Sequence, residues 1–207
     1  MIRLLGKLPR RVTVAVSGGV DSMVLLDFLS RNHEIEAAFF NHGTENSQRA
    51  QEFLVGELNI RGIPLVIGHL ANERTADQSP EEFWREERYR YLDSLPAETI
   101  VTAHTLDDAV ETWIWSSLHG TSRLLPYRRN RVIRPLLLTE KKCLVDWAHR
   151  KNVKWVEDTS NGDMRYTRNY IRRELMPHAR RVNPGIHTMI RRRLEERFEN
   201  LDKSGVD

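Results

Sequence analysis

The sequence predicts an α/β fold in which a five-stranded parallel sheet is flanked by helices and followed by a helical C-terminal extension. Apolar runs rich in β-branched residues alternate with helical segments, which is the order of a parallel sheet with crossover helices. This alternation ends near residue 152, and arginine-rich helical sequence follows. Since 207 residues with 40% hydrophobic content can bury one sizeable core, we expect a main domain over 1–152 and an arginine-rich helical extension over 153–207.

The expected strands are residues 12–16, 35–40, 64–67 and 99–102, with a weaker fifth at 132–135. Residues 23–29 form an apolar helical stretch after the first strand. Ser79 is followed by a proline suited to the first helical position and by a glutamate that can close a capping box, so a helix is predicted over 80–95. Two further helix starts are expected at Thr139 and Asn183.

Composition limits the location and the partners of the chain. No apolar stretch approaches the roughly 20 residues that cross a bilayer, so we expect a cytoplasmic protein without a membrane partner. The single cysteine, Cys143, excludes an intramolecular disulfide and a Cys-x-x-Cys metal site. The net charge is only +3, but residues 161–200 carry ten arginines against five acids. This excess suits a polyanion such as RNA, although residues 191–197 are equally typical of a solvated helix face.

A phosphate-binding loop is predicted between the first strand and the helix after it. Its small and polar residues are Ser17, Gly18, Gly19, Asp21 and Ser22. Consecutive small residues let backbone N–H groups face an anion, and the positive end of the helix dipole points at the same place. A carboxylate there would repel phosphate, so Asp21 is most simply explained by a divalent cation between the two. The alternative is an ordinary glycine-rich turn with Ser22 as the helix N-cap.

A second polar cluster follows the fourth strand. His104, Asp108 and Glu111 are spaced i, i+4 and i+7, which predicts one helix face. Two carboxylates so close repel each other unless a metal or a basic partner neutralises them, and magnesium prefers oxygen ligands. The alternative is a charged first helical turn without chemistry. Because the carboxyl ends of parallel strands meet at one edge of a sheet, we expect this cluster and the loop at 17–22 to converge.

The loop resembles the PP-loop of N-type ATP pyrophosphatases, and the chain resembles the catalytic domain of the tRNA(Ile)-lysidine synthetase family in a compact form. Beyond Ser-Gly-Gly-x-Asp-Ser, the likeness extends over residues 41–43, 85–89, 103–112, 119–122, 134–137, 157–161 and 168–172. It implies an adenine nucleotide alpha hydrolase-like, Rossmann-like fold. It also implies a carbon–nitrogen ligase that uses ATP and Mg²⁺ to adenylate the wobble cytidine of a tRNA(Ile) with a CAU anticodon. L-lysine then displaces AMP to give lysidine.

The resemblance implies roles for individual residues. ATP would be bound by Ser17, Gly18, Gly19, Asp21, Ser22 and His42. The reacting centre would be lined by Arg85, His104, Asp108 and Glu111. Asp21 and Asp108 would hold Mg²⁺, and either Asp108 or Glu111 would accept a proton from the lysine amine. RNA contacts would come from Gly120, Thr121, Ser122, Arg123, Arg168, Asn169 and Arg172.

The chain departs from the family pattern after the second strand. The family commonly has Asp-His-Gly-Leu-Arg where residues 41–45 read Asn-His-Gly-Thr-Glu. Two other functions stay open at this point. One is a PP-loop enzyme that adenylates another RNA base or a small molecule, and the other is a nucleotide- or RNA-binding protein without turnover. Family members often dimerise, so a homodimer is a further expectation.

Overall fold

A six-stranded sheet forms the centre of the computed structural model, which describes residues 1–75, 78–157 and 167–204. The strands are β1 (Arg11–Val16), β2 (Glu34–Asn41), β3 (Leu65–His69), β4 (Ile100–Thr102), β5 (Arg128–Arg129) and β6 (Val132–Ile133). Their order across the sheet is β3-β2-β1-β4-β6-β5. The five predicted strands are confirmed, and all their pairings are parallel.

The prediction of only five strands was wrong, because β5 adds a sixth. β5 pairs with β6 in the antiparallel direction through a tight turn at Asn130, whose φ is +53°. The strand is two residues long and both of them are exposed arginines. Such a strand carries no hydrophobic alternation, so periodicity could not reveal it.

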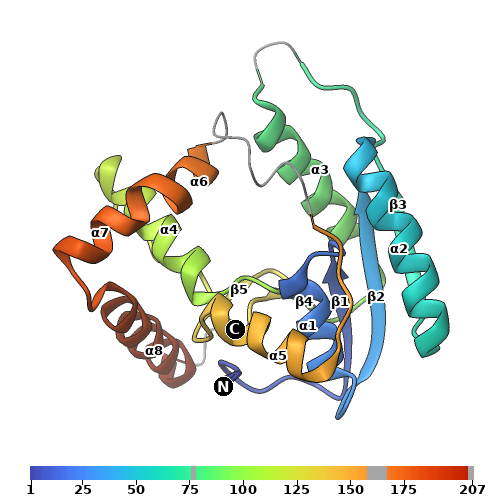
Figure 1. Cartoon of the computed structure of the whole chain (residues 1–207), viewed down its shortest axis with the longest axis horizontal. Coiled ribbons are helices and arrows are strands. Elements are labelled where there is room, and N and C mark those ends of the chain that lie inside the picture. The colour runs from blue at the N-terminus through green and yellow to red at the C-terminus, as the bar shows by residue number, and fades with distance from the viewer. Residues whose placement is uncertain (76–77, 158–166, 205–207) are drawn as a thin grey trace.

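The helices cover both faces of the sheet (Figure 1). They are α1 (Val20–Leu29), α2 (Glu45–Arg61), α3 (Pro80–Ser94), α4 (Leu106–Leu118), α5 (Lys141–Lys151), α6 (Thr167–Tyr170), the π-helix η2 (Ile171–Leu175), α7 (Met176–Val182) and α8 (Ile186–Ser204). Val14 and Val16 of β1 share a core with α1, α2 and α5, whereas Ala15 packs toward α3. Since successive strand residues point to opposite faces, α1 and α3 lie on opposite sides of the sheet.

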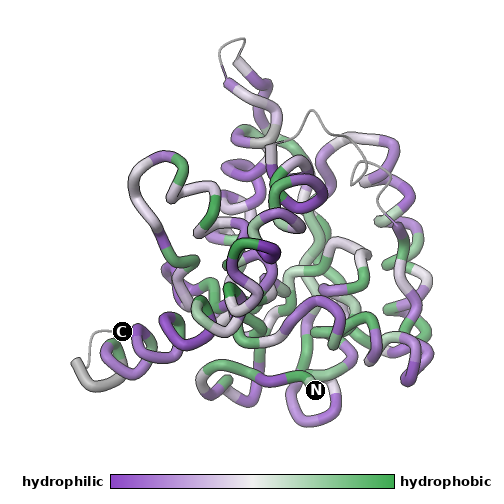
Figure 2. Tube along the Cα trace, turned by 60° about the vertical axis from the view of Figure 1, so that its left-hand side comes forward, coloured by the Kyte–Doolittle hydropathy of each residue, from purple (hydrophilic) through white to green (hydrophobic). Residues whose placement is uncertain are grey.

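The C-terminal helices pack on α4. Leu106, Val110 and Ile114 of α4 form a second core with apolar residues of η2, α7 and α8, including Ile190 and Leu194. Along α8, hydrophobic and hydrophilic residues alternate at helical spacing (Figure 2), so one side of that helix is buried and the other carries charge. Within the described ranges, no helix has the length and apolar character needed to span a membrane.

Three predicted helix starts can be compared with the structure. The start at Ser79 is confirmed, because its side chain accepts a hydrogen bond from the backbone N–H of Glu82. The start at Thr139 was wrong by one residue. Its hydroxyl donates to the Arg3 carbonyl (2.7 Å) and holds the N-terminal segment, so Glu140 is the N-cap of α5. The start at Asn183 is close, since its side chain accepts from the N–H of Gly185 (3.0 Å) just before α8 begins.

The π-helical turn η2 interrupts the helical run from α6 to α7. Pro177 has no backbone N–H, and in an α-helix its ring would clash with the carbonyl four residues before it, at Arg173. The wider η2 turn, which ends two residues before Pro177, accommodates this restriction. Arg172 lies in this turn, so its direction depends on a local irregularity that the proline favours.

Candidate functional site

The loop after β1 has the geometry of an anion-binding turn. Gly18 has φ +81°, a conformation that favours glycine, and an added Cβ would lie 2.9 Å from Val156. Gly19 is the N-cap of α1 and provides no side-chain hydrogen bond to the first helical turn. The alternative interpretation, with Ser22 as the N-cap, is therefore wrong, because the Ser22 hydroxyl donates to the Gly19 carbonyl (2.9 Å) and accepts from the N–H of Ser17 (3.1 Å). The first N–H groups of α1 thus face the position that an anion would occupy.

Asp21 is a half-buried carboxylate, and one of its two oxygens has no hydrogen-bond partner in the described residues. Its Oδ2 accepts a hydrogen bond from Lys141 Nζ at 3.0 Å, and its buried Oδ1 has no hydrogen-bond partner in the described residues. Burial raises the pKa of Asp21, although Lys141 opposes the shift; the negative charge of Asp108 raises it further. An unpartnered carboxylate oxygen beside a phosphate-binding turn fits a divalent cation. In the described part of the chain, no three acidic, histidine or cysteine side chains are grouped closely enough to bind a metal by themselves.

Asp108 is fixed by a capping box at the start of α4. Its Oδ2 accepts from the backbone N–H of Thr105 (2.6 Å) and from the Thr105 hydroxyl (3.0 Å). Its Oδ1 accepts from Nη2 of Arg168 (2.7 Å) and Nη2 of Arg172 (3.2 Å). Burial by itself raises the pKa of this carboxyl, but Arg168 and the other donors outweigh burial and lower it to about 2. Asp108 is therefore ionised at every physiological pH.

Glu111 completes a cluster of two acids and two arginines. Its side chain is 3% exposed and accepts from Arg168 Nε (3.1 Å) and Arg172 Nε (2.6 Å). The two arginine side chains are 46% and 33% exposed, so one side of the cluster is open to solvent. The neutralising partner that the close carboxylates require is thus supplied by Arg168 and Arg172. The sequence assigned both arginines to RNA, and nothing in their spacing indicated that they turn toward α4.

His104 lies close to this cluster but not on the helix. Because α4 begins at Leu106, the prediction of one helix face for His104, Asp108 and Glu111 was wrong for the histidine. Its Nδ1 is 2.9 Å from the Thr102 hydroxyl. Burial lowers the pKa of His104 to about 3; Asp108 opposes the shift and nearby arginines add to it. The imidazole is therefore neutral at pH 7.

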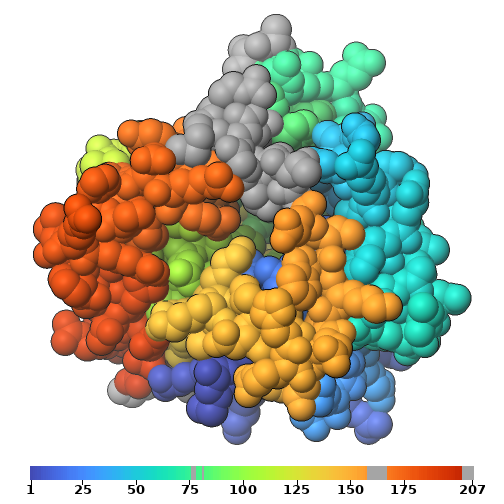
Figure 3. Space-filling view, viewed as in Figure 1, coloured from blue at the N-terminus to red at the C-terminus, as the bar shows by residue number. Residues whose placement is uncertain are grey.

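The loops after β1 and β4 converge as expected. Lys141 donates from Nζ to Asp21 (3.0 Å) and from its backbone N–H to Asp107 (2.7 Å), which brings the first turns of α1 and α4 together. Figure 3 shows a recess on this face, between α4 and α5, with the colour of the α1 region visible in its floor. Lys141, at the start of α5, also belongs to this centre, and sequence reasoning missed it. The only sequence signal for Lys141 is its position shortly after the apolar residues 136–138, and that signal is weak.

The remaining predicted residues lie on α3, in the loop after β2 and on α6. Arg85 is exposed on α3, and His42 is half-buried with its ring 5.0 Å from Phe40 and 5.9 Å from Trp84. Asn169 is half-buried on α6. Residues 158–161 of the family-like segment lie outside the described residues.

The segment from Gly120 to Arg123 forms an exposed loop after α4. The buried side chain of Ser116 accepts a hydrogen bond from the N–H of Arg123 (2.7 Å), and the Thr121 hydroxyl donates to the Ser116 carbonyl (3.1 Å). Gly120 and Ser122 have φ values of +77° and +44°. The loop is therefore held in a defined shape, because the hydroxyls of Thr121 and Ser122 both bond to residues of α4.

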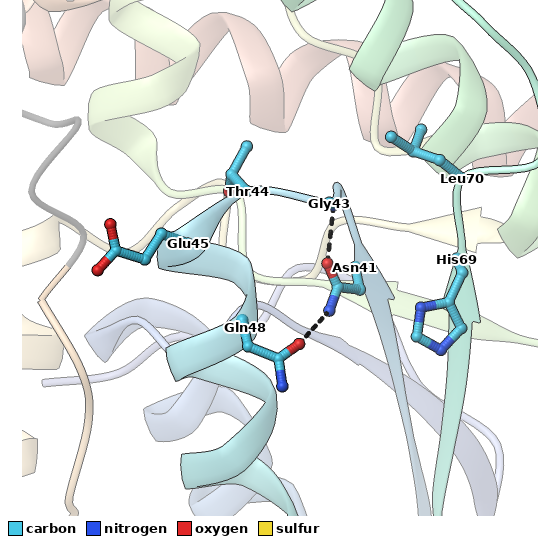
Figure 4. Close-up of a pocket in the computed structure, with 7 residues that line it drawn as sticks. All are labelled: Asn41, Gly43, Thr44, Glu45, Gln48, His69 and Leu70. Carbon is cyan, nitrogen blue, oxygen red and sulfur yellow. Dashed lines mark hydrogen bonds between the residues drawn. The ribbon is translucent and has the colours of Figure 1, made fainter.

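A pocket of about 500 Å³ lies at the ends of β2 and β3 (Figure 4). It is lined by Asn41, Gly43, Thr44, Glu45, Gln48, His69 and Leu70. The Asn41 side chain donates to Gln51 (2.8 Å) and accepts from the N–H of Gly43 (2.8 Å). The three residues that differ from the family pattern, Asn41, Thr44 and Glu45, thus all line this pocket, so the departure alters the lining of a cavity.

Comparisons with known proteins agree with this geometry. A family model described as a PP-loop domain matches residues 3–179. The chain is 32% identical over 206 residues to the tRNA(Ile)-lysidine synthase of Thermosipho africanus, which covers 91% of this chain and 48% of that protein. It is 35% identical over 191 residues to the tRNA(Ile)-lysidine synthase of Nitrosomonas europaea, which covers 84% of this chain and 42% of that protein. The chain thus spans about half the length of the curated relatives that it matches.

Among solved structures, the U34-tRNA thiolase NcsA from Methanococcus maripaludis superposes with a TM-score of 0.74 at 17% sequence identity. The superposition covers 93% of this chain and 74% of that chain. At this identity the likeness shows a shared fold.

Proposed function

The chain belongs to the PP-loop domain family, and from this premise we propose that it uses ATP to join L-lysine to the wobble cytidine of a tRNA(Ile) with a CAU anticodon. The relatives of about one-third identity that carry this activity in their names support the proposal. The observation that carries it is that Lys141 joins Asp21 to the first turn of α4, which bears Asp108, because a two-step adenylation and ligation needs a phosphate site beside an amine site.

In the first step, the 2-carbonyl oxygen of the cytidine attacks the α-phosphorus of ATP, and pyrophosphate leaves. We assign the phosphates to the N-terminal turn of α1, where N–H groups lack a capping side chain. Lys141, 3.0 Å from Asp21, adds a positive charge at the same place. In the second step, the lysine ε-amine attacks C2 of the adenylated base, and AMP leaves.

We assign different roles in the second step to the two buried carboxylates, Asp108 and Glu111. A lysine ammonium must bind and then lose a proton before it can attack. Asp108 is held as an anion by the backbone N–H and the hydroxyl of Thr105 even without the arginines, so we assign it to binding of the ammonium. Glu111 then accepts the proton. Arg168 and Arg172 bind these carboxylates in the structure, so the lysine ammonium has to displace at least one of them. Arg168 is the more exposed of the two, with 46% of its side chain exposed against 33% for Arg172.

Mg²⁺ would neutralise charge on the ATP phosphates. Asp21 fits such an ion, because its buried Oδ1 has no hydrogen-bond partner in the described residues. Asp108 fits less well in this arrangement, since its two oxygens already accept hydrogen bonds from Thr105, Arg168 and Arg172. We therefore propose Asp21 as the main protein ligand of the metal.

The test is incorporation of labelled lysine into a tRNA(Ile) transcript with a CAU anticodon, in the presence of ATP and Mg²⁺. We expect the Asp108→Asn variant to lose at least 100-fold in incorporation, the scale of a lost active-site electrostatic group, while ATP binding changes little. Asp146→Asn, an exposed site on α5, is the control for removal of one charge and should behave as wild type. Absence of incorporation by the wild type, beside an active relative, would refute the proposal.

A second candidate is a PP-loop enzyme that adenylates another RNA base or a small molecule. The altered lining of the pocket at Asn41 and Glu45 favours it, because a changed pocket can accept a different group. Pyrophosphate release that is independent of both lysine and the anticodon sequence would support this candidate over lysine ligation.

A further inference from the structure

A group of arginines without acidic partners surrounds Tyr89 on α3. The Cζ atom of Arg129 lies 4.7 Å from the centre of the Tyr89 ring, and those of Arg85 and Arg88 lie at 5.7 and 5.8 Å. Arg134, which is 1% exposed, donates from Nη2 to the Tyr89 hydroxyl at 2.8 Å. Four guanidinium groups therefore lie around one phenol ring.

The nearby acids do not neutralise this group. Glu86 accepts a hydrogen bond from Gln78 (2.8 Å), and Glu87 pairs with Arg90 and accepts from Asn72. Among the residues that the structure describes, no carboxylate lies within ion-pair distance of Arg85, Arg88, Arg129 or Arg134. Cation–π contacts attract each arginine to the ring, but they do not cancel repulsion among the arginines.

The excess of positive charge lowers the pKa of two residues in this group, Arg88 and Tyr89. Burial lowers the pKa of Arg88, and the charges of Arg168, Arg85 and Arg134 lower it further. Burial raises the pKa of Tyr89, but the arginines outweigh burial and the net shift is downward. The Nε of Arg134 is also buried without an acceptor in the described part of the chain. The group has donors and positive charge in excess, which an anion would satisfy.

We propose that Arg85, Arg88 and Arg129, supported by Tyr89 and Arg134, form a binding site for a phosphodiester of the RNA substrate. The inference rests on the proposed function, because it takes RNA as the substrate. Guanidinium groups bind phosphate oxygens in pairs, and several arginines around one point suit a phosphate better than a carboxylate or a single halide. Two members of the group, Arg134 and Arg88, also act electrostatically on His104, so we assign the phosphate to a nucleotide close to the reacting base.

The sheet separates this site from the phosphates of ATP. Tyr89 packs in the core formed by Ala38 and Ile100, on the face covered by α3. The turn at the start of α1 belongs to the other face, whose core contains Val14 and Met23. Tyr89 and the ATP phosphates that we assign to α1 are therefore held by different cores of the fold.

The experiment measures binding of a fluorescent anticodon stem-loop RNA with a CAU loop at several salt concentrations. Arg129→Gln is the main variant, because Arg129 is exposed and its loss should leave the fold intact. We expect roughly tenfold weaker RNA binding, and a salt dependence whose log–log slope falls by about 0.7, the value for one phosphate contact of a single strand. Binding of ATP and of inorganic pyrophosphate should not change.

Arg11→Gln is the matched control. It removes the same charge from an exposed arginine at the N-terminal end of β1, away from the loop that follows this strand. RNA binding should stay within twofold of wild type. Arg88→Gln, with thermal unfolding as a check on its fold, provides a second variant inside the group. An unchanged salt slope in both Arg129→Gln and Arg88→Gln would overturn the inference. Weaker pyrophosphate or ATP binding with normal RNA binding would also overturn it, because the phosphate would then come from the nucleotide.

The same samples separate this inference from the proposed function. In one outcome, the wild type binds the RNA and incorporates no lysine, and the Arg129→Gln variant loses one phosphate contact. The arginine site then stands and lysine ligation fails. If lysine is incorporated and the salt slope is indifferent to Arg129 and Arg88, ligation stands and the arginine site fails. A wild type that binds no RNA overturns both.

Discussion

His104 and Asp108 are neighbouring groups whose ionisation is set in opposite ways. Burial keeps the imidazole neutral, whereas Arg168 and other donors keep the carboxylate charged despite its burial. A neutral imidazole keeps one hydrogen-bond donor and one acceptor at pH 7, whereas the carboxylate beside it only accepts. At the residue scale, the charge state of each titratable group therefore depends on its contacts and cannot be read from the residue type alone.

The pKa of His104 predicts acid sensitivity of the fold. The folded-state pKa is about 3 and the ordinary value is 6.5, so between these values the unfolded chain binds the proton more tightly. Stability is therefore complete above about pH 6.5 and falls as the pH decreases, by at most about 1.4 kcal/mol per pH unit from this residue. We expect His104→Gln to flatten this loss between pH 6.5 and 4.5, as measured by urea unfolding.

The control for this prediction is His178→Gln, which replaces an exposed histidine on α7 and should keep the wild-type pH dependence. The titration of Asp108 does not contribute to the pH dependence between pH 6.5 and 4.5. Its lowered pKa adds stability that is lost only as the pH falls below about 4 toward 2. Equal pH profiles for wild type and His104→Gln would show that the histidine is not held neutral by burial.

At the scale of elements, the sequence predicted what local interactions determine. The β1 loop, the parallel strands and the start of α3 follow from alternation, small residues and capping, which act over a few positions. It could not predict the contact of Arg168 and Arg172 with α4, which joins residues about 60 positions apart through a π-helical turn. Nor could it predict Lys141 beside Asp21, 120 positions away.

Two glycines offer a test of the loop geometry. Gly18→Ala places a side chain at φ +81° and brings its Cβ to 2.9 Å from Val156, so we expect a loss of about 1–2 kcal/mol in unfolding free energy and weaker ATP binding. Gly56→Ala makes the same change inside α2, where no atom lies within 4 Å, and should gain about 0.5–1 kcal/mol with normal ATP binding. Urea unfolding and equilibrium dialysis with ATP measure both effects. A neutral Gly18→Ala would mean that the loop does not need its left-handed residue.

At the scale of the whole molecule, two hydrophobic cores lie next to each other at the site. One core joins the sheet with α1, α2 and α5, and the second joins α4 with η2, α7 and α8. Asp21 comes from the first, and Asp108 and Glu111 come from the second. Contacts such as Arg191 with Glu140 (3.0 Å) and Asp107 with the N–H of Lys141 (2.7 Å) connect the two. A ligand bound between Asp21 and Asp108 should therefore stabilise the packing of one core against the other.

This arrangement predicts that ATP with Mg²⁺ raises the stability of the entire fold. Because a ligand that binds only the folded state adds RT ln(1 + [L]/Kd), saturation at 100 times Kd should add about 2.7 kcal/mol to the unfolding free energy. Removal of Mg²⁺ with EDTA should remove most of this gain. Asp21→Asn should lose the Mg²⁺-dependent part, since its Oδ1 is the buried oxygen without a partner in the described residues, whereas Asp146→Asn should keep it. Thermal and urea unfolding with and without ATP, Mg²⁺ and EDTA measure these differences. If Asp21→Asn gained as much from Mg²⁺–ATP as the wild type, the metal would have to bind through other groups, and the convergence of the two cores on Asp21 would have no part in nucleotide binding.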